Sequence, residues 1–167
     1  MINSLKYIST RGSAPELSFK DVIFEGLASD GGLYVPKHWP CLSNELIDSF
    51  SSMTYQEIAY EVISPYIDST LSDEDLKAII KKSYSCFDNT EITPLTKLDN
   101  KNYLLELYHG PTYAFKDVAM QFISQLMNFY LNENKQSINI LGATSGDTGA
   151  AAIEGFKNVK SAKIFIL

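Results

Sequence analysis

The first half of the chain has apolar residues at the spacing of helix faces. Residues 19–27 place four on one face, at Phe19, Val22, Ile23 and Leu27. Further helices are predicted after three capping residues, namely Ser43, Thr54 and Ser72. Glu57 stands three residues after Thr54 and completes a capping box. With short strands at residues 4–8 and 33–35, this pattern predicts a small, mostly helical N-terminal subdomain.

The rhythm changes after a connector at residues 89–96, so the domain boundary is placed between a subdomain of residues 1–90 and a domain of residues 91–167. Strands are predicted at 103–108, 137–141 and 162–167, and helices at 115–131 and 149–156. In the first helix, the predicted buried stripe is Phe115, Val118, Ala119, Phe122, Leu126 and Phe129. Strand–helix–strand–helix–strand is the pattern of an open, mostly parallel α/β sheet.

Ligands of open α/β sheets bind beyond the carboxyl ends of the strands. A loop containing Lys116 follows the first predicted strand, and the loop of residues 142–149 follows the second. If those strands are parallel neighbours, both loops lie at one edge of the sheet. The sequence therefore predicts a single site that both loops share.

Lys116 is predicted to lie in the first turn of a helix, where the helix dipole disfavours a cation. That environment lowers an amine's pKa and favours a nucleophilic lysine that can form a Schiff base. Placement alone also allows a surface lysine that extends past Phe115 and pairs with Asp117.

The loop GATSGDTGA supplies glycines, hydroxyls and a helix start, which together suit an anion. It lacks the Gly-Lys-Ser/Thr of a Walker loop and the GxGxxG spacing of a dinucleotide site. An ordinary capped turn, with Asp147 or Thr148 as the N-cap, explains the loop equally well.

Composition narrows the class of protein. The chain has 167 residues, 45% of them hydrophobic, and a formal net charge of −6, which argues against a nucleic-acid partner. It contains neither an apolar run of membrane-spanning length nor an N-terminal apolar segment of the signal-peptide kind. Cys41 and Cys86 have no metal-type spacing, so free thiols and a cytoplasmic location without a metal are expected.

The segment HGPTYAFKD, residues 109–117, resembles the lysine motif HGPT-x-AFKD of the threonine synthase family. Residues 7–12 with 26–36, and residues 143–149, are similar to further segments of that family. The resemblance implies the N-terminal part of a pyridoxal-phosphate enzyme related to the tryptophan synthase β-subunit. It makes residues 1–90 the family's N-terminal subdomain and residues 91–167 the start of its catalytic domain.

The same resemblance implies a reaction and its residues. Lys116 would hold pyridoxal 5′-phosphate through a Schiff base and move protons, while His109, Pro111 and Thr112 shape its turn. The substrate's carboxylate would be held by Ser145, Gly146, Asp147 and Thr148. The implied small-molecule substrate is O-phospho-L-homoserine, which reacts with water to give L-threonine and phosphate.

Nothing after Thr148 resembles the family's loop for the cofactor phosphate or its partner for the pyridine nitrogen. The chain also stops at Leu167 within an apolar strand. We therefore expect a truncated part of a longer parent enzyme that is inactive alone and does not retain the cofactor.

Three alternatives stay open. One is another pyridoxal-phosphate enzyme of the same fold, such as a dehydratase or cysteine synthase. A second is a non-catalytic binding module, whose expected signature, loss of the lysine, is not found. A third is a phosphate-binding protein that uses only the glycine loop.

Overall fold

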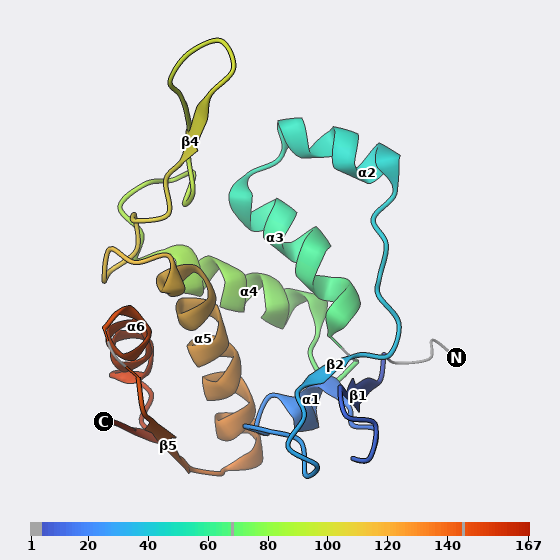
Figure 1. Ribbon diagram of the computed structural model, residues 1–167. Helices are drawn as coiled ribbons and strands as arrows, with labels where there is room; N and C mark the ends of the chain where they lie inside the picture. The colour runs from blue at the N-terminus through green and yellow to red at the C-terminus, as the bar shows by residue number, and fades with distance from the viewer. Residues whose placement is uncertain (1–4, 68, 145) are drawn as a thin grey trace. The chain divides into compact units, whose positions relative to one another are not determined.

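The computed structural model describes residues 5–67, 69–144 and 146–167 (Figure 1). Its elements in chain order are β1 (Tyr7–Ser9), α1 (Phe19–Val22), β2 (Tyr34–Pro36), α2 (Asn44–Ser49), η1 (Phe50–Ser52), α3 (Tyr55–Ile63), η2 (Ser64–Tyr66), α4 (Asp73–Tyr84), β3 (Leu95–Lys97), β4 (Tyr103–Leu105), α5 (Lys116–Asn134), β5 (Ile138–Gly142), α6 (Asp147–Phe156) and β6 (Ala162–Ile166). The chain forms two compact units, Met1–Lys77 and Ala78–Leu167. The domain division between residues 90 and 91 stays a prediction. The α/β fold class is confirmed.

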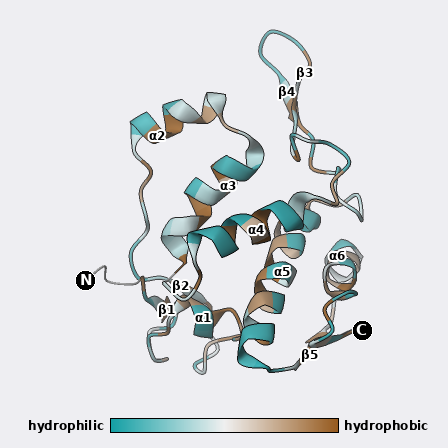
Figure 2. Cartoon of the chain, turned by 180° about the vertical axis from the view of Figure 1, so that it is seen from behind, coloured by the Kyte–Doolittle hydropathy of each residue, from teal (hydrophilic) through white to brown (hydrophobic). Residues whose placement is uncertain are grey.

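The predicted helix starts are confirmed in the first unit and at α4. Ser43 accepts a hydrogen bond from the Leu46 N–H, and Thr54 with Glu57 forms the complete capping box. Ser72 accepts one from the Asp75 N–H at the start of α4. Figure 2 shows polar and apolar residues alternating around α4, which buries Leu76, Ile79 and Ile80.

The helix predicted over residues 19–27 is wrong in length, because α1 ends at Val22. The chain then turns, and the Ala28 N–H donates to the Gly32 carbonyl before β2 pairs antiparallel with β1. Both strands lie close to their predicted positions, although residue 4 lies outside the described residues. Ile23 and Leu27, which fit the helical spacing, therefore lie after the end of α1, in the segment that leads to β2.

Asp30 organises that turn. Its carboxylate accepts hydrogen bonds from the Ser9 hydroxyl and from the N–H groups of Ser13, Ala14 and Gly32. These donors, with Ser9 the largest cause, lower the pKa of Asp30 from 3.8 to about 2. The segments STRG and SDGG, which flank α1 in sequence, are therefore joined by one carboxylate.

Replacing Asp30 with Asn is expected to destabilise the first unit at neutral pH. The folded-state pKa is depressed, so the stability from this group is present above its unfolded pKa and is lost as pH falls from about 4 toward 2. Urea unfolding of both proteins across that pH range measures the difference. Equal pH dependence in the two proteins would contradict this role, and Asp48→Asn is the control.

The second unit contains a parallel pair, β5 and β6, connected through α6. This confirms the predicted strand–helix–strand order of residues 137–167. Helix α6 lies beside α5 (Figure 1). A Cβ on Gly155 would lie 3.0 Å from the Met120 carbonyl oxygen and 3.2 Å from Ser124 Oγ, so glycine permits the close approach of the two helices.

The first strand of the predicted parallel sheet is wrong. Residues 103–108 form only the short strand β4, which pairs antiparallel with β3 and exposes Tyr103, Leu104 and Leu105. An apolar run indicates a strand but does not identify its partner. In the second unit, α4 is therefore followed by an exposed β-hairpin.

The predicted stripe of α5 is also largely wrong. Of its members only Leu126 is buried, and Phe115 is exposed. The buried face is instead Asp117, Gln121, Ser124, Leu126, Met127, Tyr130 and Leu131. The buried face begins with the polar residues Asp117, Gln121 and Ser124, which a search for apolar periodicity does not find.

Candidate lysine turn and anion-binding loop

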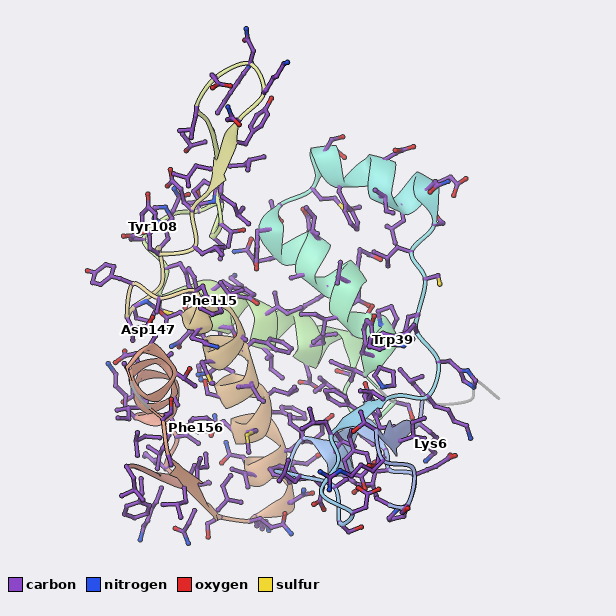
Figure 3. All side chains as sticks on the ribbon, viewed as in Figure 1. Lys6, Trp39, Tyr108, Phe115, Asp147 and Phe156 are labelled. Atoms are coloured by element: carbon purple, nitrogen blue, oxygen red, sulfur yellow. The ribbon has the colours of Figure 1, made fainter. Side chains whose placement is uncertain are left out.

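Lys116 lies in the first turn of α5, as predicted, and is the first residue of that helix. Phe115, labelled in Figure 3, precedes it at the start of α5. Phe115 has helical backbone angles, and its side chain makes no capping hydrogen bond. The first N–H groups of a helix point outward and carry partial positive charge. The Lys116 side chain therefore starts from the positive end of a nineteen-residue helix.

The Lys116 amine lies over a ring, and no carboxylate of the described residues pairs with it. Its Nζ is 4.5 Å from the centroid of the Phe115 ring. Extension past Phe115 is therefore observed, whereas the alternative pairing with Asp117 is not. The carboxylate of Asp117 is fully buried and is occupied by Thr112.

Asp117 closes the turn in front of α5. The Thr112 N–H donates to Asp117 Oδ2 at 2.7 Å, and the Thr112 hydroxyl lies 2.9 Å from each carboxylate oxygen. A Cβ on Gly110 would lie 2.4 Å from the Asp117 Cβ and 2.6 Å from its Oδ2. The Asp117 carboxylate therefore explains two residues of the motif: it leaves no room for a side chain at Gly110, and it accepts hydrogen bonds from Thr112.

The remaining bonds make the turn compact. The Tyr113 N–H donates to the Gly110 carbonyl, and Tyr113 has a φ of 58°, in the left-handed region. Left-handed backbone is unfavourable for an aromatic residue and persists only where its surroundings fix it. The side chain of Tyr113 is exposed, so this conformation buries no ring.

His109 begins the motif between two carboxylates. Its Nδ1 lies 2.7 Å from Asp88 Oδ1, and its Nε2 lies 2.8 Å from Glu106 Oε2. Glu106 also accepts from the Thr96 hydroxyl at 2.6 Å. Sequence reasoning named His109 but missed Asp88 and Glu106, and an acidic residue three positions before a histidine was the available signal.

The glycine loop leads from β5 into α6. Gly146 is the N-cap with a φ of 75°, and no side chain in the described part of the loop caps the helix. The alternative that Asp147 or Thr148 is the N-cap is therefore wrong. A Cβ built on Gly146 would meet nothing within 4 Å. Asp147, labelled in Figure 3, and Thr148 belong to the first turn of α6. The predicted Ser145 lies outside the described residues.

Residues 146–148 are adjacent at the start of α6, and Lys116 is at the start of α5. The prediction that the strands before the two loops are parallel neighbours is wrong, because β4 pairs with β3 and β5 pairs with β6. The packing of α6 on α5 at Gly155 is what links the two helices. A single site formed by both loops therefore stays a prediction.

These features define an α/β chain with two helix starts of interest. One carries an amine that pairs with no described carboxylate, and the other has N–H groups that can bind an anion. The family described as "Threonine synthase N terminus" matches residues 6–84. The chain is 45% identical to threonine synthase of Pseudomonas aeruginosa over 163 residues, which are 98% of this chain and 35% of that protein. It is 44% identical to threonine synthase of Schizosaccharomyces pombe, covering 100% of this chain and 34% of the relative.

Solved structures of threonine synthases are also similar to this chain. Threonine synthase of Brucella melitensis, described as bound to PLP, superposes with a TM-score of 0.93 at 42% identity and matches 98% of this chain and 35% of its own. The yeast enzyme gives a TM-score of 0.91 at 42% identity, with the same two coverages. The chain belongs to the threonine synthase family and spans about a third of the length of these relatives.

Proposed function

We propose that this chain supplies the lysine and the carboxylate-binding loop of a pyridoxal-phosphate-dependent threonine synthase. The reaction converts O-phospho-L-homoserine and water into L-threonine and phosphate. The observation that carries the proposal is Lys116 at the first position of α5, with Asp117 bound to Thr112 and not to the lysine. Relatives that carry the name threonine synthase support it.

The residues present fit the proposed cofactor. A Schiff base needs an amine that is not held in an ion pair, and among the described residues no carboxylate pairs with Lys116. The amine's contact is an aromatic ring, which a cofactor aldehyde can replace without leaving a buried charge unpaired. Lys116 would therefore be the covalent attachment point.

Within this chain, Lys116 would act as general base and general acid at the α and β carbons of the substrate. Pyridoxal phosphate, when bound, supplies an electron sink for that chemistry. The N–H groups at the start of α6 and the Thr148 hydroxyl would hold the substrate's carboxylate. Gly146, Asp147 and Ser145 belong to the same proposed loop.

The proposal assigns activity to a parent enzyme, meaning a polypeptide of the relatives' length that contains this chain. Residues 1–90 would be its N-terminal subdomain and residues 91–167 the start of its catalytic domain. Groups for the cofactor phosphate and ring nitrogen would come from outside this chain. No helix among the described residues is long and apolar enough to cross a membrane, and a cytoplasmic enzyme is part of the proposal.

The chain alone is expected to lose pyridoxal phosphate on dialysis and to form no threonine. A reversible bond to one lysine must offset several kcal/mol of lost freedom without the other cofactor contacts. Absorbance after dialysis and turnover of phosphohomoserine measure this, with the parent enzyme in parallel. Stoichiometric cofactor on the chain would show a complete site.

The substrate preference of the parent enzyme tests the dehydratase alternative. A parent that prefers serine or threonine as substrate would support that alternative.

Replacing Thr148 with Val in the parent enzyme is expected to weaken substrate binding more than cofactor binding. A hydrogen bond to a charged group contributes about 1.5–3 kcal/mol, or roughly 10- to 150-fold in Kd. Ser145→Ala should act in the same direction. Separate titrations with substrate and cofactor test this, and Thr90→Val, at an exposed position, is the control. Lost cofactor with unchanged substrate affinity would mean that the loop holds the cofactor.

A further inference from the structure

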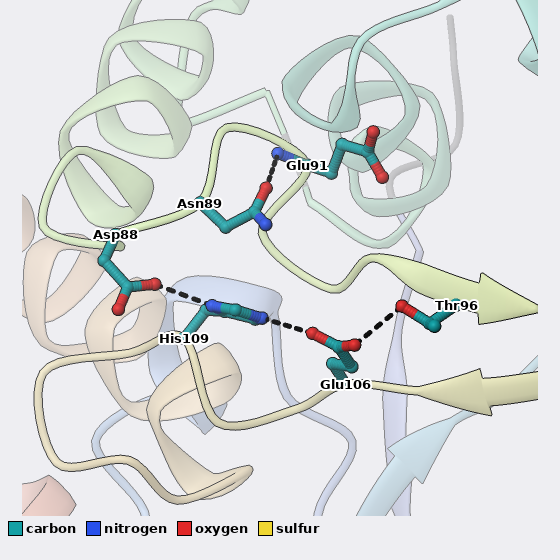
Figure 4. Close-up of polar contacts among 6 residues, drawn as sticks. All are labelled: Asp88, Asn89, Glu91, Thr96, Glu106 and His109. Carbon is teal, nitrogen blue, oxygen red and sulfur yellow. Dashed lines mark hydrogen bonds and ion pairs between the residues drawn. The ribbon is translucent and has the colours of Figure 1, made fainter.

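His109 lies between carboxylates from two different segments (Figure 4). Asp88 belongs to the segment after α4, and Glu106 directly follows β4. The two contacts measure 2.7 Å at Nδ1 and 2.8 Å at Nε2. Both are ordinary lengths for charge-assisted hydrogen bonds.

This geometry specifies the protonation state. A neutral imidazole has one N–H donor and one acceptor nitrogen, and an ionised carboxylate only accepts. Two carboxylates at hydrogen-bond distance therefore require both nitrogens to donate, so His109 is an imidazolium. Consistently, Glu106 first and Asp88 second raise the pKa of His109, and the Thr96 hydroxyl followed by His109 lowers that of Glu106.

Backbone bonds extend this cluster to the neighbouring segments. The Asp88 N–H donates to the His109 carbonyl at 3.0 Å, and the Glu106 N–H donates to the Pro94 carbonyl at 2.9 Å. The Thr96 hydroxyl adds a bond from β3 to Glu106. The hairpin, the segment after α4 and the first residue of the lysine turn are thereby fixed to one another. We name Asp88, Thr96, Glu106 and His109 the histidine clamp.

We propose that His109 is a positioning residue for Lys116, acting as an imidazolium that anchors the start of the lysine turn between Asp88 and Glu106. The proposal rests on the proposed function of Lys116. Asp117 fixes the turn from its helical end through Thr112, and the histidine clamp fixes its other end. Only six residues separate His109 from Lys116, so loss of either anchor changes where the amine is presented.

The clamp makes the turn dependent on pH. The titratable groups that face His109 are Asp88, Glu106 and Tyr108, whose ring lies 4.8 Å from the imidazole. A raised folded-state pKa stabilises the fold below the unfolded pKa, and that contribution is lost as pH rises through the folded value. The turn is therefore held while His109 is protonated and loosens, as pH rises, when His109 loses its proton.

Titration of the isotope-labelled histidines by NMR tests the clamp without any activity measurement. The chain has two histidines, and His38→Gln assigns the signals. The pKa of His109 is expected to lie above the ordinary histidine value, and Glu106→Gln should lower it. Asp88→Asn should do so less, because Asp88 has 64% of its side chain exposed and Glu106 only 17%. Glu91→Gln, a neighbouring exposed carboxylate outside the clamp, is the control. A His109 pKa at or below the ordinary histidine value, unchanged by Glu106→Gln, would overturn the proposal.

The positioning role is tested in the parent enzyme by borohydride trapping of cofactor on Lys116, with peptide mapping, and by kinetics. Glu106→Gln and His109→Gln are expected to reduce trapping rate and kcat by roughly 10- to 100-fold, with KM little changed. If loss of the His109 proton loosens the turn, kcat of the wild-type parent should fall as pH rises through the pKa of His109. His109→Gln should remove that fall. Normal trapping and kcat in both variants would overturn the positioning role. A wild-type parent that traps no cofactor would refute the proposed function, whereas the titration would still decide the clamp.

Discussion

Lys116→Ala in the parent enzyme is expected to abolish threonine formation together with the cofactor bond that borohydride reduces. The substitution removes the amine proposed both to hold the cofactor and to move protons. Loss of proton transfer alone reduces rates by about 10²- to 10⁴-fold. Lys116 forms no ion pair with any described residue, so the substitution should leave the fold intact.

Reduction with borohydride, digestion and mass spectrometry locate the modified lysine, and threonine formation is measured alongside. Lys101→Ala, an exposed lysine near the tip of the β3–β4 hairpin, is the matched control and should retain both properties. A reducible cofactor bond that persists in Lys116→Ala would assign the attachment to another lysine.

Local polar signals in the sequence predicted local structure well. Ser43, Thr54 and Ser72 cap helices as expected, because a capping residue and its acceptor lie within one turn of each other. The parallel β5–α6–β6 unit also follows from its sequence, since both strands are bounded by turns and separated by one helix. Lys116 at the start of α5 belongs to the same category.

Long-range pairing was not predictable in the same way. The apolar run that contains β4 looks like a buried parallel strand, but its partner is the nearby β3, and the pair forms an exposed antiparallel hairpin. Apolar character reports a preference for burial, not the identity of the neighbour. The expectation that both loops share one sheet edge depended on that neighbour.

The polar side of α5 was missed for a related reason. Asp117, Gln121 and Ser124 are buried, although residues of these types are mostly exposed. Asp117 is satisfied by Thr112, five positions earlier, and Ser124 donates to the Gln121 carbonyl. Apolar periodicity cannot identify buried polar residues, and the burial of Asp117 and Ser124 is explained by their hydrogen-bond partners.

Asp117 leads to the second large expected effect, since its fully buried carboxylate carries the bonds that shape the lysine turn. Asp117→Ala removes the acceptor for the N–H and hydroxyl of Thr112. Bonds to charged groups contribute about 1.5–3 kcal/mol each, so a loss of roughly 3 kcal/mol in the free energy of unfolding is expected. Because Lys116 is its neighbour, cofactor trapping should fall as well.

A graded series separates stability from positioning. Asp117→Asn keeps an acceptor for the Thr112 N–H, and Thr112→Val removes only the hydroxyl, so both should cost less than Asp117→Ala in urea unfolding. Asp99→Asn changes a carboxylate that accepts backbone bonds in the exposed hairpin and is the control. If Asp117→Ala unfolds at the wild-type urea concentration and traps cofactor normally, the carboxylate does not hold the turn. If stability falls while trapping on the folded protein is unchanged, Asp117 supports the helix but does not position Lys116.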